Sequence, residues 1–85
     1  MSFKAGPYTI TLGGGVLLAG AAAQGTIAVP GARAGMAVTV TPQSDPLIGC
    51  IWAGFVSAND VVTVRVVAII GLTPNSVIYN VMVEG

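Results

Sequence analysis

The sequence predicts an all-β fold: a small β-sandwich or jelly-roll-like barrel of six to seven short antiparallel strands. Apolar residues recur with a period of two along most of the 85 residues, as they do in half-buried strands. The apolar runs are rich in Val and Thr and are separated by turns drawn from 12 Gly and 5 Pro. Only the Ala-rich segment 17–23 has helical apolar spacing. Many short strands with Gly and Pro turns are typical of sandwiches and barrels.

The first half of the chain contains three predicted strands. They cover residues 8–12, 25–29 and 36–41. In the first of them, Tyr8, Ile10 and Leu12 alternate with threonines, which places the three large side chains on one face. The second is closed by Pro30-Gly31, because Pro fixes φ and Gly adopts the conformation that a turn requires. The third repeats the alternation of apolar residues with Thr.

The second half begins with the strongest local signal, a β-hairpin. An apolar run, residues 50–56, is followed by four turn-forming residues, 57–60, and by a Val-rich run, residues 61–68. Two β-prone runs joined by a short turn are typical of a hairpin. One face of the second run is wholly apolar and is expected to face the core. It holds Val62, Val64, Val66 and Ala68.

The last predicted strand covers residues 77–83, after the turn 73–76. The face expected to be buried carries Val77, Tyr79, Val81 and Val83. Ile78 and Met82 lie on its other face, so this strand is apolar on both sides, as is the run 50–56. A strand of an isolated sandwich needs only one apolar face, so the second faces predict contact with another subunit.

Residues 1–24 differ in character from the remainder. They are rich in Gly and Ala and join the rest of the chain through the small residues 21–24. We therefore divide the chain into an N-terminal strand or arm, residues 1–24, and a β-sandwich domain, residues 25–85. Two interpretations of the strand at 8–12 stay open. It adds to the sheet of a neighbouring copy and caps an exposed edge, or it is an ordinary first strand of the same domain.

The surface predicted for this chain is poor in charge. Only 7% of the residues are charged and 54% are apolar, whereas about a quarter of a typical domain is charged. A compact monomer of this size exposes roughly 4,600 Å², or one charged side chain for roughly 770 Å². Such a surface favours association, with a soluble monomer coated in Thr, Gly and Ala as the alternative. The candidate interface residues are Tyr8, Ile10, Ile51, Trp52, Phe55, Arg65, Ile78 and Met82.

The sequence contains little that could perform catalysis or bind a metal. There is no His and a single Cys, Cys50, so neither a zinc site nor a Cys–His nucleophile can be assembled. The three acidic residues, Asp45, Asp60 and Glu84, are divided between two turns and the C-terminus. The Gly cluster 13–15 lacks the Gly-Lys-Ser/Thr ending of a phosphate loop. We therefore expect no enzymatic activity, no cofactor and no metal.

The aromatic and charged residues of the apolar strands have two interpretations each. Trp52 and Phe55 could form the platform of a carbohydrate-binding module, although an isolated Trp is more often a core or interface anchor. Arg65 is the one charge in the middle of a predicted strand. It either pairs with a carboxylate of a neighbouring subunit or projects into solvent.

Nucleic acid and membrane partners are not expected. The net charge is zero and the three basic residues are scattered, whereas binding to nucleic acid or anionic lipid depends on clustered Lys and Arg. A membrane-spanning helix needs about 20 continuous apolar residues. The two longest apolar runs are broken by the Gly cluster 13–15 and by the polar residues 57–60.

The order of segments in the second half of the chain carries a resemblance to a known group of proteins. A Val-Thr-Val-Thr-Pro strand at 38–42 is followed by Trp-Ala-Gly-Phe-Val-Ser-Ala-Asn-Asp at 52–60 and by Val-Val-Thr-Val-Arg-Val at 61–66. Residues 25–83 thereby resemble small β-rich domains of tailed-phage virion proteins, in which an aromatic-Val-Ser-Ala turn leads into a Thr-Val-Arg strand. Residues 1–24 have no counterpart in that pattern.

The resemblance implies a function in assembly. In such relatives the domain occurs in capsid cement or decoration proteins, which lie on the capsid surface of the virion. The resemblance thus implies a chain that binds the major capsid protein and forms a homo-oligomer, with a trimer favoured. A tail or fibre component is the alternative.

Overall fold

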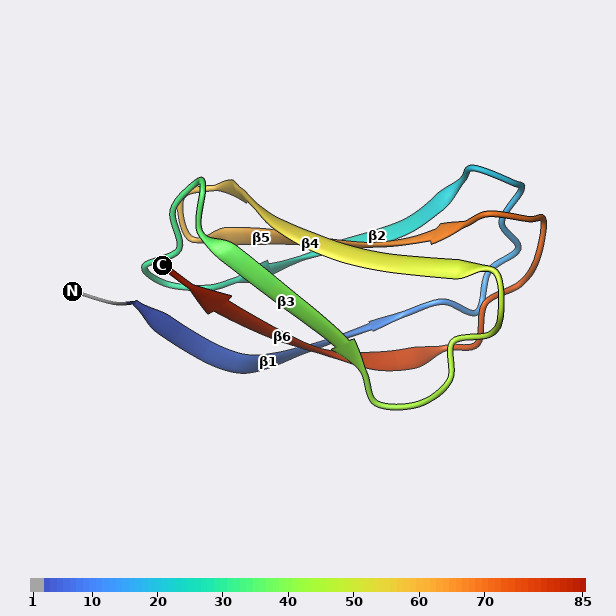
Figure 1. Cartoon of the computed structure of the whole chain (residues 1–85), viewed down its shortest axis with the longest axis horizontal. Helices are drawn as coiled ribbons and strands as arrows, with labels where there is room; N and C mark the ends of the chain where they lie inside the picture. Colours follow the sequence, from blue (N-terminus) through green and yellow to red (C-terminus); the bar gives the residue numbers. More distant parts are fainter. Residues whose placement is uncertain (1–2) are drawn as a thin grey trace.

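The computed structural model of the chain describes residues 3–85 and contains six β-strands (Figure 1). Their bounds are β1 Lys4–Leu12, β2 Ala22–Ala28, β3 Ala37–Pro42, β4 Cys50–Ala58, β5 Val61–Ala68 and β6 Val77–Glu84. All strand pairs are antiparallel, and the strands form two three-stranded sheets packed face to face. The predicted all-β fold is confirmed as a six-stranded sandwich.

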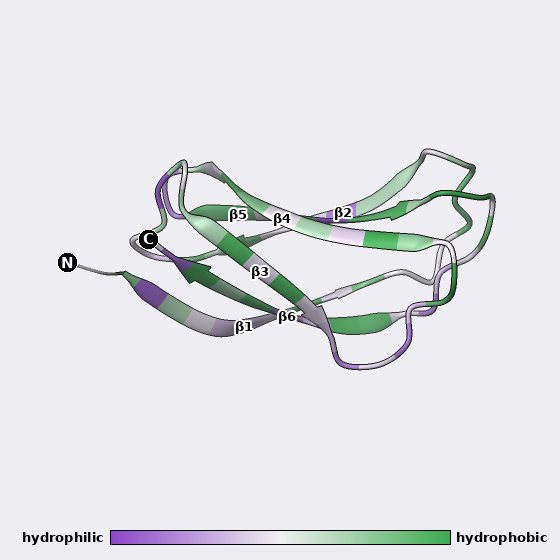
Figure 2. Cartoon of the chain, in the orientation of Figure 1, coloured by the Kyte–Doolittle hydropathy of each residue, from purple (hydrophilic) through white to green (hydrophobic). Residues whose placement is uncertain are grey.

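Each sheet has a strongly apolar strand in its middle. The strand order is β1-β6-β3 in one sheet and β2-β5-β4 in the other, so β5 and β6 are hydrogen-bonded on both sides. Figure 2 shows hydrophobic residues along much of both strands. A central strand is flanked by two neighbours and covered by the opposite sheet, so its inner side chains lose nearly all contact with water.

The inner faces of β5 and β6 form the core, as the sequence predicts. Their inner side chains are each no more than 2% exposed; they are Val62, Val64, Val66, Ala68, Val77, Tyr79, Val81 and Val83. Val29 and Ala32 from the loop after β2, together with Val56 of β4, complete the main cluster. The core is built mainly of Val because branched side chains pack well on a pleated surface.

The turn between β4 and β5 is shorter than the sequence predicts. Residues 57–60 were expected to form it, but β4 continues to Ala58 and only Asn59-Asp60 separate the strands. A register irregularity between Val56 and Ala58 accommodates one extra residue, and Asp60 has a φ of 65°. Asp adopts this left-handed conformation more readily than most residues. The sequence therefore locates the turn but overestimates its length.

The N-terminal segment is part of the sandwich. β1 begins at Lys4, earlier than the predicted strand at 8–12, and pairs with β6 of the same chain. Residues 22–24, expected to be a loose connection, belong to β2 because β5 offers them hydrogen-bonding partners as far as Val67. The boundary predicted between residues 24 and 25 falls inside this strand. Residues 1 and 2 of the predicted arm lie outside the described residues.

The two sheets approach each other closely where Gly54 of β4 faces β3. A Cβ at Gly54 would lie 2.9 Å from both Val38 Cγ1 and Val40 Cγ2. Both methyl groups belong to β-branched side chains that are stiff about χ1, so they cannot turn away easily. We expect Gly54→Ala to lower the free energy of unfolding by about 1–3 kcal/mol, as overpacking does. Urea denaturation measures this loss.

Gly25→Ala is the matched control, because Gly25 also lies in a half-buried position of the same sheet. Its Cβ would lie 2.6 Å from Ile10 Cδ1, the flexible end of a side chain that can change rotamer. Gly25→Ala is therefore expected to cost less than Gly54→Ala. A control that loses as much stability as Gly54→Ala would mean that β3 yields readily and that the contact at Gly54 is not tight.

Candidate interaction surface

The molecule is elongated, and its two ends differ in chemistry. It measures 42 × 21 × 16 Å along its principal axes. One end carries both chain termini and the β4–β5 turn, and the other carries the loops 13–21, 43–49 and 69–76 (Figure 1). We call the first the charged end, because four of the six charged residues lie there: Lys4, Arg33, Asp60 and Glu84. Arg65 lies in the middle of β5, and Asp45 belongs to the opposite end.

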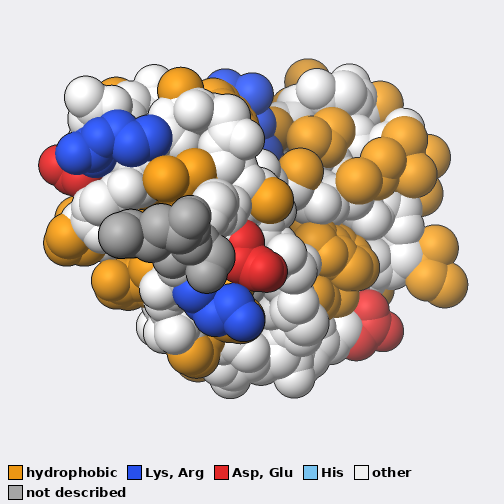
Figure 3. Space-filling model, turned by 60° about the vertical axis from the view of Figure 1, so that its left-hand side comes forward, with side chains coloured by type: hydrophobic (Ala, Val, Ile, Leu, Met, Phe, Trp, Pro, Cys, Tyr) orange, Lys and Arg blue, Asp and Glu red, His pale blue; other side chains and the backbone are white. Residues whose placement is uncertain are grey.

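The end formed by the three loops, which we call the apolar end, exposes six large aliphatic side chains. They are Val16, Leu18, Leu47, Ile48, Ile69 and Ile70, with exposed fractions from 42% to 88%. They make up more than half of the eleven exposed large hydrophobic side chains in residues 3–85, and Asp45 is the only charged residue in the three loops. In Figure 3 hydrophobic side chains gather on the right of the view and basic side chains on its left and centre.

Backbone hydrogen bonds join the three loops of the apolar end to one another. Leu17 and Leu72 exchange two bonds, with N···O distances of 2.8 and 2.9 Å. The N–H of Ile69 donates to Gly49 O at 2.8 Å, which links the loop after β5 to the loop before β4. Loops whose backbone polar groups are paired can present apolar side chains at a fixed position. The apolar end is therefore an ordered surface.

Leu47 of the apolar end has an unusual backbone conformation. Its φ is 108°, a region that residues with a side chain rarely adopt. The Asp45 carboxylate holds it there by accepting a hydrogen bond from Leu47 N at 2.9 Å, and Asn75 Nδ2 donates to Asp45 O at 3.0 Å. A strained, solvent-exposed Leu gains nothing for the isolated fold. Such strain is often retained at surfaces that carry function.

The charged end is organised around Asp60. Its Oδ1 accepts hydrogen bonds from Arg33 Nη1 and from Gly31 N, both at 2.8 Å, and its backbone N–H donates to Ala32 O at 2.9 Å. These bonds tie the β4–β5 turn to the loop between β2 and β3. The Arg33 side chain, followed by the Gly31 N–H, lowers the pKa of the Asp60 carboxyl below its ordinary value. The predicted role of Asp60 in a turn is thus joined by a role in holding two loops together.

The lowered pKa of Asp60 gives a testable dependence of stability on pH. A carboxyl whose pKa is lower in the folded state contributes stability above its unfolded pKa and loses it as the pH falls through the folded pKa. We expect the thermal midpoint to fall as the pH is lowered below about 4. Asp60→Asn keeps the turn residue and an acceptor oxygen but cannot titrate, so its midpoint should fall less steeply over the same range. Identical slopes for parent and variant would contradict the expectation.

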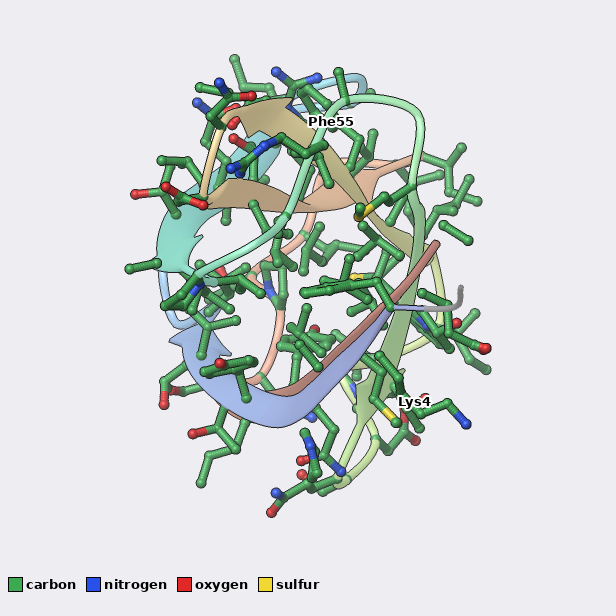
Figure 4. All side chains as sticks on the ribbon, turned by 90° about the vertical axis from the view of Figure 1, so that its left-hand side faces the viewer. Lys4 and Phe55 are labelled. Carbon is green, nitrogen blue, oxygen red and sulfur yellow. The ribbon has the colours of Figure 1, made fainter. Side chains whose placement is uncertain are left out.

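The candidate interface residues predicted from the sequence are divided among three places. Ile51 and Phe55 are exposed on the outer face of the β2-β5-β4 sheet, where Arg65 lies 5.1 Å from the centroid of the Phe55 ring. Figure 4 shows Phe55 on this sheet and Lys4 on the opposite one. Ile78 and Met82 are exposed on the outer face of the other sheet, so the two strands apolar on both faces do not make one common surface.

The remaining candidates face the inside of the sandwich. Tyr8 and Ile10 of β1 are half-buried and pack against the main core cluster. Trp52 lies on the inner side of β4 opposite Val66, yet it keeps 36% of its surface exposed near the open side between β3 and β4. Trp52 and Phe55 therefore project to opposite faces of β4 and cannot form one flat platform for a sugar. Arg65 donates to Gln24 Oε1 at 2.8 Å on the outer face.

Sequence reasoning missed most of the apolar end. Val16, Leu18, Ile48, Ile69 and Ile70 are not among the predicted candidates, because they lie outside the predicted strands. A signal was present nevertheless. Loop segments are usually polar, and here each of three segments bounded by Gly or Pro contains adjacent large aliphatic residues.

The described residues offer this surface for binding rather than a centre for chemistry. Residues 3–85 contain no group of three or more Cys, Asp or Glu positioned to hold a metal ion. An open hollow of about 350 Å³ at the charged end is lined by Phe3, Lys4, Glu84 and Gly85. No helix in the described part of the chain is long and apolar enough to cross a membrane.

Comparison with known proteins gives this chain no relative to borrow from. No protein-family model, no curated protein and no solved structure matches it. The geometry of its surface therefore has to carry any functional argument.

Proposed function

We propose that this chain is a structural protein of a tailed-phage virion, namely a capsid cement or decoration protein that binds shell subunits as a homo-oligomer. The observation that carries the proposal is the separation of charged and apolar surface along the long axis. A surface polarised in this way is suited to being covered at one end while the other stays in water. Residues 25–83 add the likeness to virion domains described above.

The apolar end is large enough to support a specific interface. If a fully exposed aliphatic side chain offers about 180 Å², the six side chains together expose roughly 700 Å². The largest apolar patch of a typical monomer is roughly 300–600 Å², and a standard interface takes roughly 800 Å² from each partner. Burying 700 Å² of apolar surface is worth about 17 kcal/mol before the cost of association is subtracted. We assign the apolar end to the shell.

Binding to shells tests this assignment. Purified protein is added to capsids that lack it, the mixture is sedimented, and bound protein is counted per shell subunit. Saturable binding at a near-stoichiometric copy number, with a rise in the temperature at which the shells break, is the expected result. Recovery of the protein only with isolated tails would assign it to the tail, and no recovery with either fraction would overturn the proposal.

Leu47→Gly separates binding from folding. Gly adopts a φ of 108° without strain, so we expect the variant to fold with a free energy of unfolding about 1 kcal/mol higher than the parent. It also removes one of the six exposed side chains, so its affinity for shells should fall about tenfold, the effect of 1.4 kcal/mol. Met82→Ser, on the outer face of β6, is the control and should bind like the parent. Undiminished binding by Leu47→Gly would exclude the apolar end from the interface.

A further inference from the structure

Four of the six strands are sheet edges, and β4 is the edge least protected against pairing. β1 carries Lys4 and Pro7 and has an irregular register between Ala5 and Tyr8. β3 has six residues and ends at Pro42, and β2 has seven residues with a glycine at its fourth position. β4 has nine residues, no charge and no proline. Charges, prolines, irregularities and short length are the features by which natural edges avoid pairing.

The edge of β4 is free along most of its length. Its only hydrogen-bonded neighbour is β5. β3 approaches it from the other sheet through side chains, Val38 and Val40 against Gly54, and the two strands are not paired. In Figure 1 no other segment lies in front of β4 over most of its course. The one irregularity of β4 lies near its end, after Val56, so the stretch 50–56 is a regular strand with unpaired backbone groups.

We propose that two copies of this chain pair through β4 in antiparallel orientation, with Ala53 on the twofold axis. The proposal rests on the proposed function in one respect, that the protein works as a homo-oligomer. Pairing joins two three-stranded sheets into one continuous six-stranded sheet. Because each copy uses its own β4 edge, the contact is closed at two copies. The trimer implied by the sequence resemblance is not made in this way.

The register about Ala53 suits both faces of the sheet. It places Ile51 of one copy opposite Phe55 of the second copy on the outer face. On the inner face it places Trp52 opposite Gly54 of the second copy, so the largest side chain of β4 meets the position with none. An axis at Trp52 would set two indole rings against each other. A shift by a single residue would turn every side chain to the wrong face.

The size of the contact predicts a reversible dimer. Ile51, Trp52 and Phe55 are between 36% and 53% exposed, and with the edge backbone they offer roughly 500 Å² from each copy. That is less than the roughly 800 Å² of a standard interface, so dissociation in the micromolar range is expected. The half-buried Val38 and Val40 of β3 lie beside Gly54, where the Trp52 ring of the second copy would cover them.

Charge reversal at the axis is the decisive experiment. Ala53 is exposed, so Ala53→Lys and Ala53→Glu are expected to fold, as circular dichroism will confirm. The parent should show twice the 8.4 kDa of one chain by light scattering at about 100 μM. Each variant alone sets like charges directly opposite each other and should be monomeric. An equimolar mixture sets Lys opposite Glu and should restore the dimer.

Thr26→Lys is the matched control, because Thr26 is an exposed position on β2, the other edge of the same sheet. It should leave the dimer intact. A parent that stays monomeric at this concentration, a parent with three times the mass of one chain, or a mixture that fails to pair would each overturn the β4 contact.

A cysteine cross-link checks the register independently of charge. In a Cys50→Ser background, Ala53→Cys places two thiols opposite each other on the axis, where cross-strand Cα atoms are about 4.5–5.5 Å apart, within the range of a disulfide. Mild oxidation with copper phenanthroline should give mostly disulfide-linked dimer, and Thr26→Cys in the same background should give little. Equal cross-linking at both positions would overturn the proposal. Failure here leaves shell binding by the apolar end, which Leu47→Gly tests, as a separate question.

Discussion

Tyr79→Ala is expected to leave most molecules unfolded at 25 °C, whereas Tyr79→Phe is expected to fold at least as well as the parent. Tyr79 is fully buried and is the largest fully buried side chain of the described residues. Truncating a buried aromatic side chain to Ala costs about 3–5 kcal/mol. A domain of this length has roughly 4–13 kcal/mol of stability in total, so the truncation removes a large share of it.

The position of Tyr79 explains why the loss cannot be absorbed. With Val66 and Val77 it forms a second core cluster, towards the apolar end of the sandwich, against which Leu12 and Cys50 also pack. These neighbours come from different strands of both sheets, so no single side chain can move into the space left by the ring. The cavity would also loosen the support beneath the loops of the apolar end.

Tyr79→Phe removes only the hydroxyl group, which is buried and has no hydrogen-bond partner among the described residues. A buried polar atom without a partner has lost its hydration and gained nothing in return, so its removal should raise the free energy of unfolding by up to about 1 kcal/mol. Burial, and to a smaller extent Cys50, also raises the pKa of the Tyr79 hydroxyl. A group whose folded pKa is raised contributes stability below its unfolded pKa and loses it as the pH rises through the folded pKa.

The two Tyr79 variants therefore have three readouts. Urea denaturation should rank Tyr79→Phe at or above the parent and place Tyr79→Ala far below it. Above pH about 10 the parent should lose stability more steeply than Tyr79→Phe, because the variant has no hydroxyl to ionise at this position. A clear destabilisation of Tyr79→Phe would show that the hydroxyl is hydrogen-bonded in solution, and a mild effect of Tyr79→Ala would place the ring outside the core.

The strands and the core could be predicted because they depend on local pattern. Alternation along the chain decides which side chains of a strand share a face, so the buried residues of β5 and β6 follow directly from the sequence. Val62 to Ala68 and Val77 to Val83 alternate without interruption, and the structure buries the expected side of each. The hairpin between β4 and β5 was likewise accessible, since both runs are β-prone and adjacent in the chain.

The parts that could not be predicted depend on contacts between distant segments. β2 extends back to Ala22 only because β5 supplies hydrogen-bonding partners, and a run of alanines does not announce this. The apolar end arises because three loops, each with its own aliphatic residues, are brought to one end by the topology. No single segment reveals that its neighbours will also be apolar. The sequence indicated a surface for association but placed its centre on β4 and β6 alone.

Three adjacent glycines allow a graded test of how the apolar end is held. Gly13 has a φ of 109°, and a Cβ there would overlap the carbonyl oxygen of Asn75 in the loop before β6. Gly14 has a φ of 86° with space around it, and Gly15 has neither a positive φ nor a neighbour within 4 Å. Alanine at these positions therefore adds strain and overlap, strain alone, or neither.

Gly13→Ala is expected to destabilise the protein by about 3 kcal/mol or more. Backbone strain accounts for about 1–2 kcal/mol of this, and displacement of the Asn75 backbone accounts for the rest. Gly14→Ala should lose about the strain contribution only, and Gly15→Ala should be neutral or slightly stabilising because it restricts the unfolded chain. Calorimetric melting of the three variants gives the series directly. Because Gly14 N donates to Pro74 O at 2.8 Å, a shift of this loop would carry Val16 and Leu18 with it. Gly13→Ala should therefore weaken shell binding more than its stability loss alone requires, and equal melting temperatures for Gly13→Ala and Gly14→Ala would show that the two loops are not in close contact.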